Sequence, residues 1–412
     1  MLNLDYRLTS SCAESKNINI YTFLHAFQKD NVSQVLSEFR ESGFTGVNLA
    51  LNYHASRDIF WSNGPQLVYL KEGFHYYKPN NIFYKDTEFF PNQESTYENN
   101  ALFEKISDAG TDFNLKINAW AVYFHNLELA RDKPEFTVTN VFGNHFLTDI
   151  CPSSPQAQNY AFSLTKDLCS RGIYSLLLES IRFHNFDHGY HHERLFINIS
   201  DVTRFLFYLC FCRYCEMNFQ NLGFNVISLK KKIIEVLNLA LNAEHDPWLH
   251  LKLSKNLLAE VVGHGILDYL NIREGIVTGI YARISNICKE SGVISKFLDP
   301  SMLLNGDSEN PLENSWIAGL NVKEINQVID ICEGVYFSKD SINNTHIYKN
   351  SEAKRLGASL TPLYPFMENE HQLSRLLQKL IEDGFLDFDF YAYNLMTRNQ
   401  FSIMANSIQR FL

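Results

Sequence analysis

Eight short apolar runs rich in β-branched and aromatic residues recur along the chain and alternate with segments of helical periodicity. The runs cover residues 18–23, 45–51, 115–122, 173–179, 292–298, 333–338, 357–364 and 386–394. Strands that alternate with helices form βα units around a parallel sheet. Eight such units, followed by a C-terminal helix in "SIMANSIQRFL", predict an α/β fold of the (β/α)8, or TIM-barrel, type rather than an open doubly wound sheet.

Helix boundary signals support this alternation. The segment "NVSQVLSEFRESG" opens on an Asn cap and closes on Gly43, and "ENEHQLSRLLQKLIEDG" closes on Gly384. Both segments are therefore expected to be helices that follow a strand or lead into one.

Two connections are too long to be simple loops between a strand and a helix. One spans roughly residues 52–94, and the other runs from Glu179 to about residue 255 and contains the helical pattern "VISLKKKIIEVLNLAL". We therefore predict a single barrel domain over residues 1–412, with a long helical insertion after strand four over residues 187–255. Both connections follow the C-terminal ends of strands, which is the face where barrel enzymes carry their active sites.

Charge and hydropathy restrict the partners. The net charge of -10 argues against a nucleic-acid partner, because phosphate binders normally carry a basic surface. No window approaches 18 uninterrupted apolar residues, and "MLNLDYRLTSS" lacks a basic region followed by an apolar run. We therefore expect no membrane span, no secretory signal and a cytoplasmic setting, in which cysteines stay reduced or bind metal.

Aromatic, histidine and amide side chains follow the predicted strands at their C-terminal ends. Aromatic rings stack on the apolar faces of sugars while polar groups bond sugar hydroxyls, so a carbohydrate substrate is expected and no organic cofactor. The histidines of "HHER" lie close to Glu179 in the sequence and are expected to reach the same place. The candidate substrate-binding residues are Tyr53, His54, Trp120, His125, His191, His192 and Tyr393.

Glu179 ends the fourth predicted strand, after the apolar run "SLLL". A carboxylate that emerges from a buried strand has its pKa raised by partial burial, as a general acid requires. We therefore predict that Glu179 is a catalytic proton donor. The alternative is a structural ion pair with Arg182 or Arg194.

Glycoside hydrolysis usually needs a second carboxylate. Asp299 and Asp340 follow the fifth and sixth strands and are the candidate nucleophile or base, and Glu193 could fold back from the insertion. The seventh strand, "SLTPLYP", contains no carboxylate. This departs from the large retaining glycosidase group in which the two carboxylates follow strands four and seven.

Three cysteines within six residues, Cys210, Cys212 and Cys215, form a C-x-C-x2-C motif in "LCFCRYC". Zinc held by thiolates needs four ligands, and Cys151 in "DICPSSP" is the candidate fourth. One of the loop histidines His188, His191 and His192 is the rival ligand. We therefore predict a structural zinc site, and the alternative is a set of reduced thiols that pack in the insertion.

Several of these phrases together resemble a family of bacterial glycoside-hydrolase-like barrel proteins of the family-10 glycosyl hydrolase type. The phrases are "LALNYHASRDIF", "WAVYFHN", "FGNHFLTDICPSSPQAQNY", "LLLESIRFHNFDHGYHHE" and "LCFCRYC", and the resemblance covers roughly residues 17–395. It implies a (β/α)8 barrel with an insertion after strand four and a carbohydrate substrate. The positions that carry over are Tyr53, His54, His125, Glu179, His191, His192 and the four cysteines.

Three functions follow from these features. The first is a glycoside hydrolase or a related carbohydrate-active enzyme that uses carboxylate acid/base chemistry. The second is a barrel that binds a glycan or another ligand without cleaving it, which the missing carboxylate of strand seven favours. The third is a metal-dependent hydrolase that uses the loop histidines, although the chain contains no HExxH motif.

Overall fold

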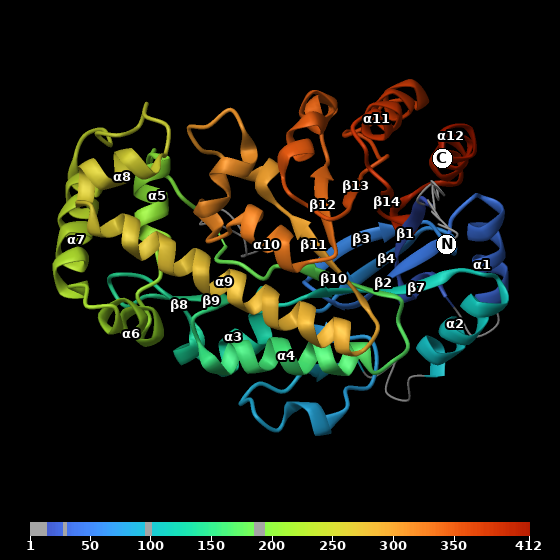
Figure 1. Ribbon diagram of the computed structural model, residues 1–412, viewed down its shortest axis with the longest axis horizontal. Coiled ribbons are helices and arrows are strands. Elements are labelled where there is room, and N and C mark those ends of the chain that lie inside the picture. Colours follow the sequence, from blue (N-terminus) through green and yellow to red (C-terminus); the bar gives the residue numbers. More distant parts are fainter. Residues whose placement is uncertain (1–14, 28–30, 95–100, 185–193) are drawn as a thin grey trace, which may run out of the picture.

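The computed structural model describes residues 15–27, 31–94, 101–184 and 194–412 (Figure 1). Eight parallel strands pair in the order β1-β14-β13-β12-β11-β10-β7-β2, and β1 also pairs with β2, so the sheet closes into a barrel. This result confirms the predicted α/β barrel. The strands are β1 (Asn17–Phe23), β2 (Gly46–Tyr53), β7 (Lys116–Val122), β10 (Ser175–Glu179), β11 (Ile294–Asp299), β12 (Ile331–Tyr336), β13 (Leu356–Leu360) and β14 (Asp387–Phe390).

Helices surround the barrel, and each buries its apolar face on the strands or on a neighbouring helix. The predicted helices at the "NVSQ" and "ENEH" segments correspond to α1 and α11, and α12 begins at a capping box formed by Thr397 and Gln400. Between β12 and β13 the connection is the 3-10 helix η7 (Lys339–Asn350). The remaining outer helices are α1 (Val32–Glu41), α2 (Ala101–Asp112), α4 (Pro155–Cys169), α9 (Gly265–Glu290), α10 (Val322–Val328), α11 (Glu370–Glu382) and α12 (Arg398–Phe411).

Four further helices lie between β10 and α9, and Figure 1 shows them gathered at the left, beyond one end of α9. They are α5 (Asp201–Tyr208), α6 (Arg213–Asn221), α7 (Val226–Asn242) and α8 (Lys255–Val262). The helix expected in "VISLKKKIIEVLNLAL" is α7. The bounds of 187–255 for the insertion stay a prediction, since its first residues lie outside the described chain.

The connections after β2 and β7 carry small strands of their own. After β2 come the antiparallel hairpin of β3 (Ser56–Phe60) and β4 (Gln66–Leu70), then β5 (Phe74–His75), the 3-10 helix η2 (Asn81–Tyr84) and β6 (Asn92–Gln93). After β7 come α3 (Leu127–Asp132), the 3-10 helix η4 (Pro134–Phe136), β8 (Thr137–Thr139) and β9 (His145–Ile150). Short 3-10 helices follow other strands: η1 (Leu24–Ala26), η5 (Ser301–Leu303), η6 (Pro311–Ala318) and η8 (Tyr393–Leu395).

The centre of the barrel contains a ring of buried polar side chains. Asp389 accepts hydrogen bonds from Asn19 at 2.6 Å and Asn48 at 2.8 Å and forms an ion pair with Lys296. Lys296 also lies 2.8 Å from Glu333. The side chains of this ring point into the barrel. Because residues of a strand alternate between the two faces of a sheet, the ring identifies which other residues of these strands also point inward.

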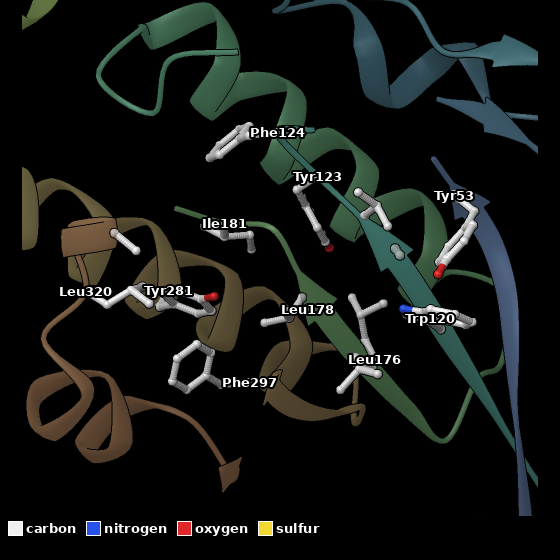
Figure 2. Close-up of a cluster of buried hydrophobic side chains, with 14 of the residues drawn as sticks. Tyr53, Trp120, Tyr123, Phe124, Leu176, Leu178, Ile181, Tyr281, Phe297 and Leu320 are labelled. Atoms are coloured by element: carbon white, nitrogen blue, oxygen red, sulfur yellow. The ribbon is translucent and has the colours of Figure 1, made fainter. Parts of the chain in front are cut away.

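The outward residues of the strands pack against the helices. Phe297 of β11, next to the inward Lys296, contacts Tyr281 of α9 at a ring distance of 5.0 Å (Figure 2). Among the helices in the described part of the chain, none combines the length and apolarity that a bilayer crossing requires.

Candidate active site

Glu179 is the last residue of β10, at the mouth of the barrel formed by the C-terminal ends of the eight strands. It pairs in register with Val122 of the neighbouring β7. The indole Nε1 of Trp120 donates a hydrogen bond to Glu179 Oε2 at 2.5 Å, and Figure 2 shows this indole beside Tyr53. Ser180 has a positive φ of 63°, so the chain turns away directly after the carboxylate.

The surroundings of Glu179 favour its protonated form. Its side chain is only partly exposed, and burial raises the pKa of its carboxyl. The Trp120 hydrogen bond, the Arg182 charge and the nearby His125 oppose this shift, but the pKa stays above its usual value. Arg182, a partner in the alternative structural ion pair, thus lowers the pKa of Glu179 but does not cancel the effect of burial.

Aromatic rings surround the Trp120–Glu179 pair. The ring of Trp120 lies 4.4 Å from Tyr53, 4.9 Å from Tyr21 and 5.8 Å from Tyr391. The hydroxyls of Tyr53 and Tyr391 are 3.4 Å apart. Trp120 is 2% exposed, so its ring packs against these neighbours and offers little surface to a ligand. The side chains of His54, Phe337 and Tyr391 are more accessible and offer ring surface at the mouth.

His54 and His125 lie together at this mouth, as the sequence suggested. Their rings are 5.8 Å apart, and His54 lies 4.0 Å from the ring of Tyr53. Burial and the neighbouring His125 lower the pKa of His54 to about 4, so its imidazole is neutral at pH 7. A neutral imidazole donates at one nitrogen and accepts at the other, which suits a sugar hydroxyl.

A buried pair lies behind His125. His184 Nδ1 is 2.7 Å from Asp149 Oδ1, and both side chains are 1% exposed. Burial alone would raise the pKa of Asp149, but His184 and His125 hold it below its usual value. His125 also approaches the Thr148 carbonyl at 3.1 Å, so its ring is held in place.

Asp299 ends β11 but does not face the mouth. Since Lys296 points into the barrel, strand alternation turns Asp299 toward the helices. Asp299 is 0% exposed, and it accepts hydrogen bonds from Ser301 N at 3.0 Å and Tyr348 Oη at 2.8 Å. Its carboxylate therefore stabilises the turn after β11, which differs from its expected catalytic role.

Tyr393 also lies away from the mouth. Its hydroxyl donates to Glu38 of α1 at 2.8 Å, and its ring packs on Phe39 at 4.8 Å. Strand β14 ends at Phe390, so the alternation that would place residues 391 and 393 on one face stops before Tyr393. Tyr391 takes the position at the mouth that Tyr393 was expected to hold.

Other expected residues lie beyond the described structure. The loop histidines His188, His191 and His192 and the carboxylate Glu193 fall in a segment that the structure does not describe. Asp340 is in η7, but its side chain is not described. Their predicted roles stay predictions.

The four cysteines of the predicted metal site come together. The Sγ atoms of Cys151, Cys210, Cys212 and Cys215 all lie within 4.8 Å of one another, and all four residues are buried. Cys151 follows β9, and the β8–β9 pair contacts the cysteine segment through the Phe211 N–H and the Thr139 carbonyl at 2.6 Å. This contact brings together two segments that are about 60 residues apart.

The geometry of this cluster fits a tetrahedral metal ion. Cys151 Sγ lies 3.6 Å from the Sγ atoms of Cys210, Cys212 and Cys215. A tetrahedron with zinc–sulfur bonds of about 2.3 Å has sulfur–sulfur edges of about 3.8 Å. The cluster can therefore hold a metal ion with four thiolates and no open position. The seven cysteines in the described chain are all free.

Sequence reasoning missed two parts of this region. The first is the polar ring below the mouth, although Asn19, Asn48, Lys296 and Asp389 inside four of the predicted strands were a visible signal. The second is Asp58 in β3, which interacts electrostatically with Tyr53, Tyr391 and His54. It lies in a connection where strand periodicity alone does not identify the inward face.

Comparison with known proteins supports the fold. The catalytic domain of beta-amylase from Paenibacillus polymyxa is 10% identical and matches 96% of this chain and 98% of its own, with a TM-score of 0.57. Beta-galactosidase from Bacillus circulans sp. alkalophilus is 11% identical over 96% of this chain, with a TM-score of 0.56, but only 56% of its own chain is covered. Alpha-L-fucosidase isoenzyme 2 from Paenibacillus thiaminolyticus is 8% identical, with a TM-score of 0.53 over 96% of this chain and 49% of its own.

At these low identities, the TM-scores show a shared fold alone. The chain spans about half the length of the beta-galactosidase and the fucosidase that it matches. No protein-family model and no curated protein sequence matches the chain.

Proposed function

We propose that the protein is a glycoside hydrolase in which Glu179 is the general acid. The observation that carries this proposal is a partly exposed glutamate at the mouth of the barrel, whose pKa is raised by burial and whose carboxylate is held by Trp120. A raised pKa lets a carboxyl group keep its proton to a higher pH, and such a group can donate the proton to the leaving-group oxygen of a glycoside.

Three further features support a sugar substrate. Accessible rings at the mouth offer stacking surface, and the neutral His54 offers a donor and an acceptor for hydroxyls. Solved structures of the same fold include a beta-amylase, a beta-galactosidase and an alpha-L-fucosidase. In this proposal Tyr53, His54 and His125 contact the substrate, with His191 and His192 joining from the following loop.

The cysteine cluster has a structural role in the proposal. Cys151, Cys210, Cys212 and Cys215 would hold one zinc ion, which would tie the loop after β9 to the start of α6. Arg273, which is 3% exposed, interacts electrostatically with Cys151, Cys210 and Cys215, and its positive charge would offset part of the negative charge of a four-thiolate site. Reduced cysteines agree with a cytoplasmic setting.

The test uses the purified full chain and a panel of chromogenic probes, namely the 4-nitrophenyl β-D-galactoside, β-D-glucoside and α-L-fucoside. Glu179→Gln keeps the shape of the side chain but cannot donate the proton, so kcat should fall by roughly 10²–10⁴-fold with KM nearly unchanged. Glu104→Gln on the exposed surface of α2 is the matched control. Unchanged turnover in Glu179→Gln would refute the role of Glu179.

A barrel that binds glycans without cleaving them is the second candidate. The observation that favours it is β13, whose segment Leu356–Leu360 and following residues "TPLYP" bring no carboxylate to the mouth. In that case the wild-type chain would release no 4-nitrophenol from any probe, yet calorimetry with the parent sugars would still detect binding that Glu179→Gln weakens.

A further inference from the structure

The β3–β4 hairpin has one inner and one outer face. In its register Ile59 pairs with Leu67 and Arg57 pairs with Tyr69. Ile59, Leu67 and Tyr69 are 53%, 59% and 65% exposed, so these pairs form the outer face.

The alternate residues of the hairpin face the barrel. Phe60 and Leu70 are 2% and 4% exposed, and Phe60 stacks on Phe23 at the end of β1 with a ring distance of 5.3 Å. The N–H of Trp61 donates to the Asn394 carbonyl at 2.7 Å, which attaches the hairpin to the segment after β14. The hairpin therefore lies over the mouth between the ends of β2, β1 and β14.

Asp58 shares the inner face with Phe60. Its Oδ2 accepts a hydrogen bond from Ser56 Oγ at 2.5 Å, and its side chain stays partly exposed. The hydroxyls of Tyr53 and Tyr391, which are 3.4 Å apart, both interact electrostatically with Asp58 and with Glu179. The two carboxylates, Glu179 from β10 and Asp58 from the hairpin, thus influence the same pair of hydroxyls.

Other carboxylates near this site are occupied by structural contacts. Glu72 accepts hydrogen bonds from the Ala55 and Leu127 backbone N–H groups, at 2.5 and 3.4 Å, and is 8% exposed. Asp149 is paired with His184, and Asp299 faces the helices. Compared with Glu72, Asp149 and Asp299, Asp58 combines access to solvent with a place on the inner face of the hairpin.

We propose that Asp58 is the second catalytic carboxylate and acts as a general base toward water. This inference rests on the proposed glycoside hydrolase function. Glu179 gives its proton to the glycosidic oxygen as the bond from that oxygen to the anomeric carbon breaks. Asp58 takes a proton from a water molecule whose oxygen forms the new bond to the anomeric carbon. The proton then passes from Asp58 to solvent and Glu179 regains one, so the net reaction is hydrolysis.

Direct attack by a water molecule that Asp58 activates inverts the configuration of the anomeric carbon. Inverting enzymes separate their carboxyl groups by about 6.5–9.5 Å to admit water, whereas a nucleophile needs about 5–5.5 Å. We therefore expect inversion at the anomeric carbon.

The experiment compares Asp58→Asn with Glu179→Gln and with Asp108→Asn, a control on the exposed surface of α2. Each variant is assayed with the 4-nitrophenyl glycoside that the wild-type chain cleaves and with the 2,4-dinitrophenyl glycoside of the same sugar. A 2,4-dinitrophenolate leaves without a proton, so Glu179→Gln should recover turnover with this probe. Asp58→Asn should lose roughly 10²–10⁴-fold with both probes, because water activation is still needed.

The outcomes separate the two proposals. If Glu179→Gln is impaired but Asp58→Asn turns over within about threefold of Asp108→Asn, the role of Asp58 is overturned and that of Glu179 stands. A product that first appears with the anomeric configuration of the substrate, seen by proton NMR, also overturns the base role. Absence of cleavage by the wild-type chain on every probe overturns both. A melting temperature of Asp58→Asn equal to that of the control shows that any loss is not misfolding.

Discussion

Replacing Trp120 by Phe tests whether the indole controls the ionisation of Glu179. The substitution removes the N–H group that donates to Glu179 Oε2 at 2.5 Å but keeps an aromatic ring between Tyr21 and Tyr53. A hydrogen bond to an ionised carboxylate favours the charged form and lowers the pKa. Its loss should therefore raise the pKa of Glu179 further above its ordinary value.

The magnitude follows from the difference between two hydrogen bonds. A bond to a charged group contributes about 1.5–3 kcal/mol and a neutral one about 0.5–1.5 kcal/mol. The indole thus stabilises the ionised carboxylate over the protonated one by about 1–1.5 kcal/mol, which at 1.36 kcal/mol per unit corresponds to about one pKa unit.

Carbon-13 NMR of protein labelled at the glutamate side-chain carboxyl measures this pKa without any substrate. The resonance of Glu179 is the one that disappears in Glu179→Gln. Trp316→Phe is the matched control, because Trp316 is also buried, at 5% exposure, but lies in η6. A pKa of Glu179 in Trp120→Phe that equals or falls below the wild-type value would refute the reasoning, since desolvation would then control the ionisation alone.

Two further predictions concern stability. Elemental analysis of the purified protein should find about one zinc ion per chain, and Cys212→Ser should lower the zinc content and the melting temperature together. Cys169→Ser, outside the cluster, should leave the zinc content unchanged. Zinc-free wild-type protein with the same melting temperature would contradict a structural metal. In the barrel centre, burial and the nearby Asp389 raise the pKa of Glu333 to about 8, so Glu333 is protonated at pH 7. In urea unfolding at pH 7, Glu333→Gln should then lower the free energy of unfolding by only about 1 kcal/mol. Asp389→Asn should lower it by about 3–5 kcal/mol, because Lys296 loses its ionised partner. Equal decreases for the two variants would contradict this charge assignment.

The sequence by itself determined the parts of the molecule that depend on local patterns. The period of the eight strands predicted the barrel, and the end of the apolar run at Glu179 predicted a carboxylate at the mouth. The spacing of Cys210, Cys212 and Cys215 selected the candidate metal ligands. These patterns can be recognised in the sequence because the alternation of buried residues and the short spacing of metal ligands both occur within a single segment of the chain.

Tertiary structure alone decided which polar residues share the mouth. Asp299 faces the helices because the inward position on β11 belongs to Lys296, and Tyr393 leaves the mouth because strand alternation ends at Phe390. Asp58 lies on the inner face because the β3–β4 hairpin packs through Phe60 onto β1. These orientations depend on contacts between distant segments, which no local periodicity encodes, and so the second carboxylate could be found only in the folded barrel.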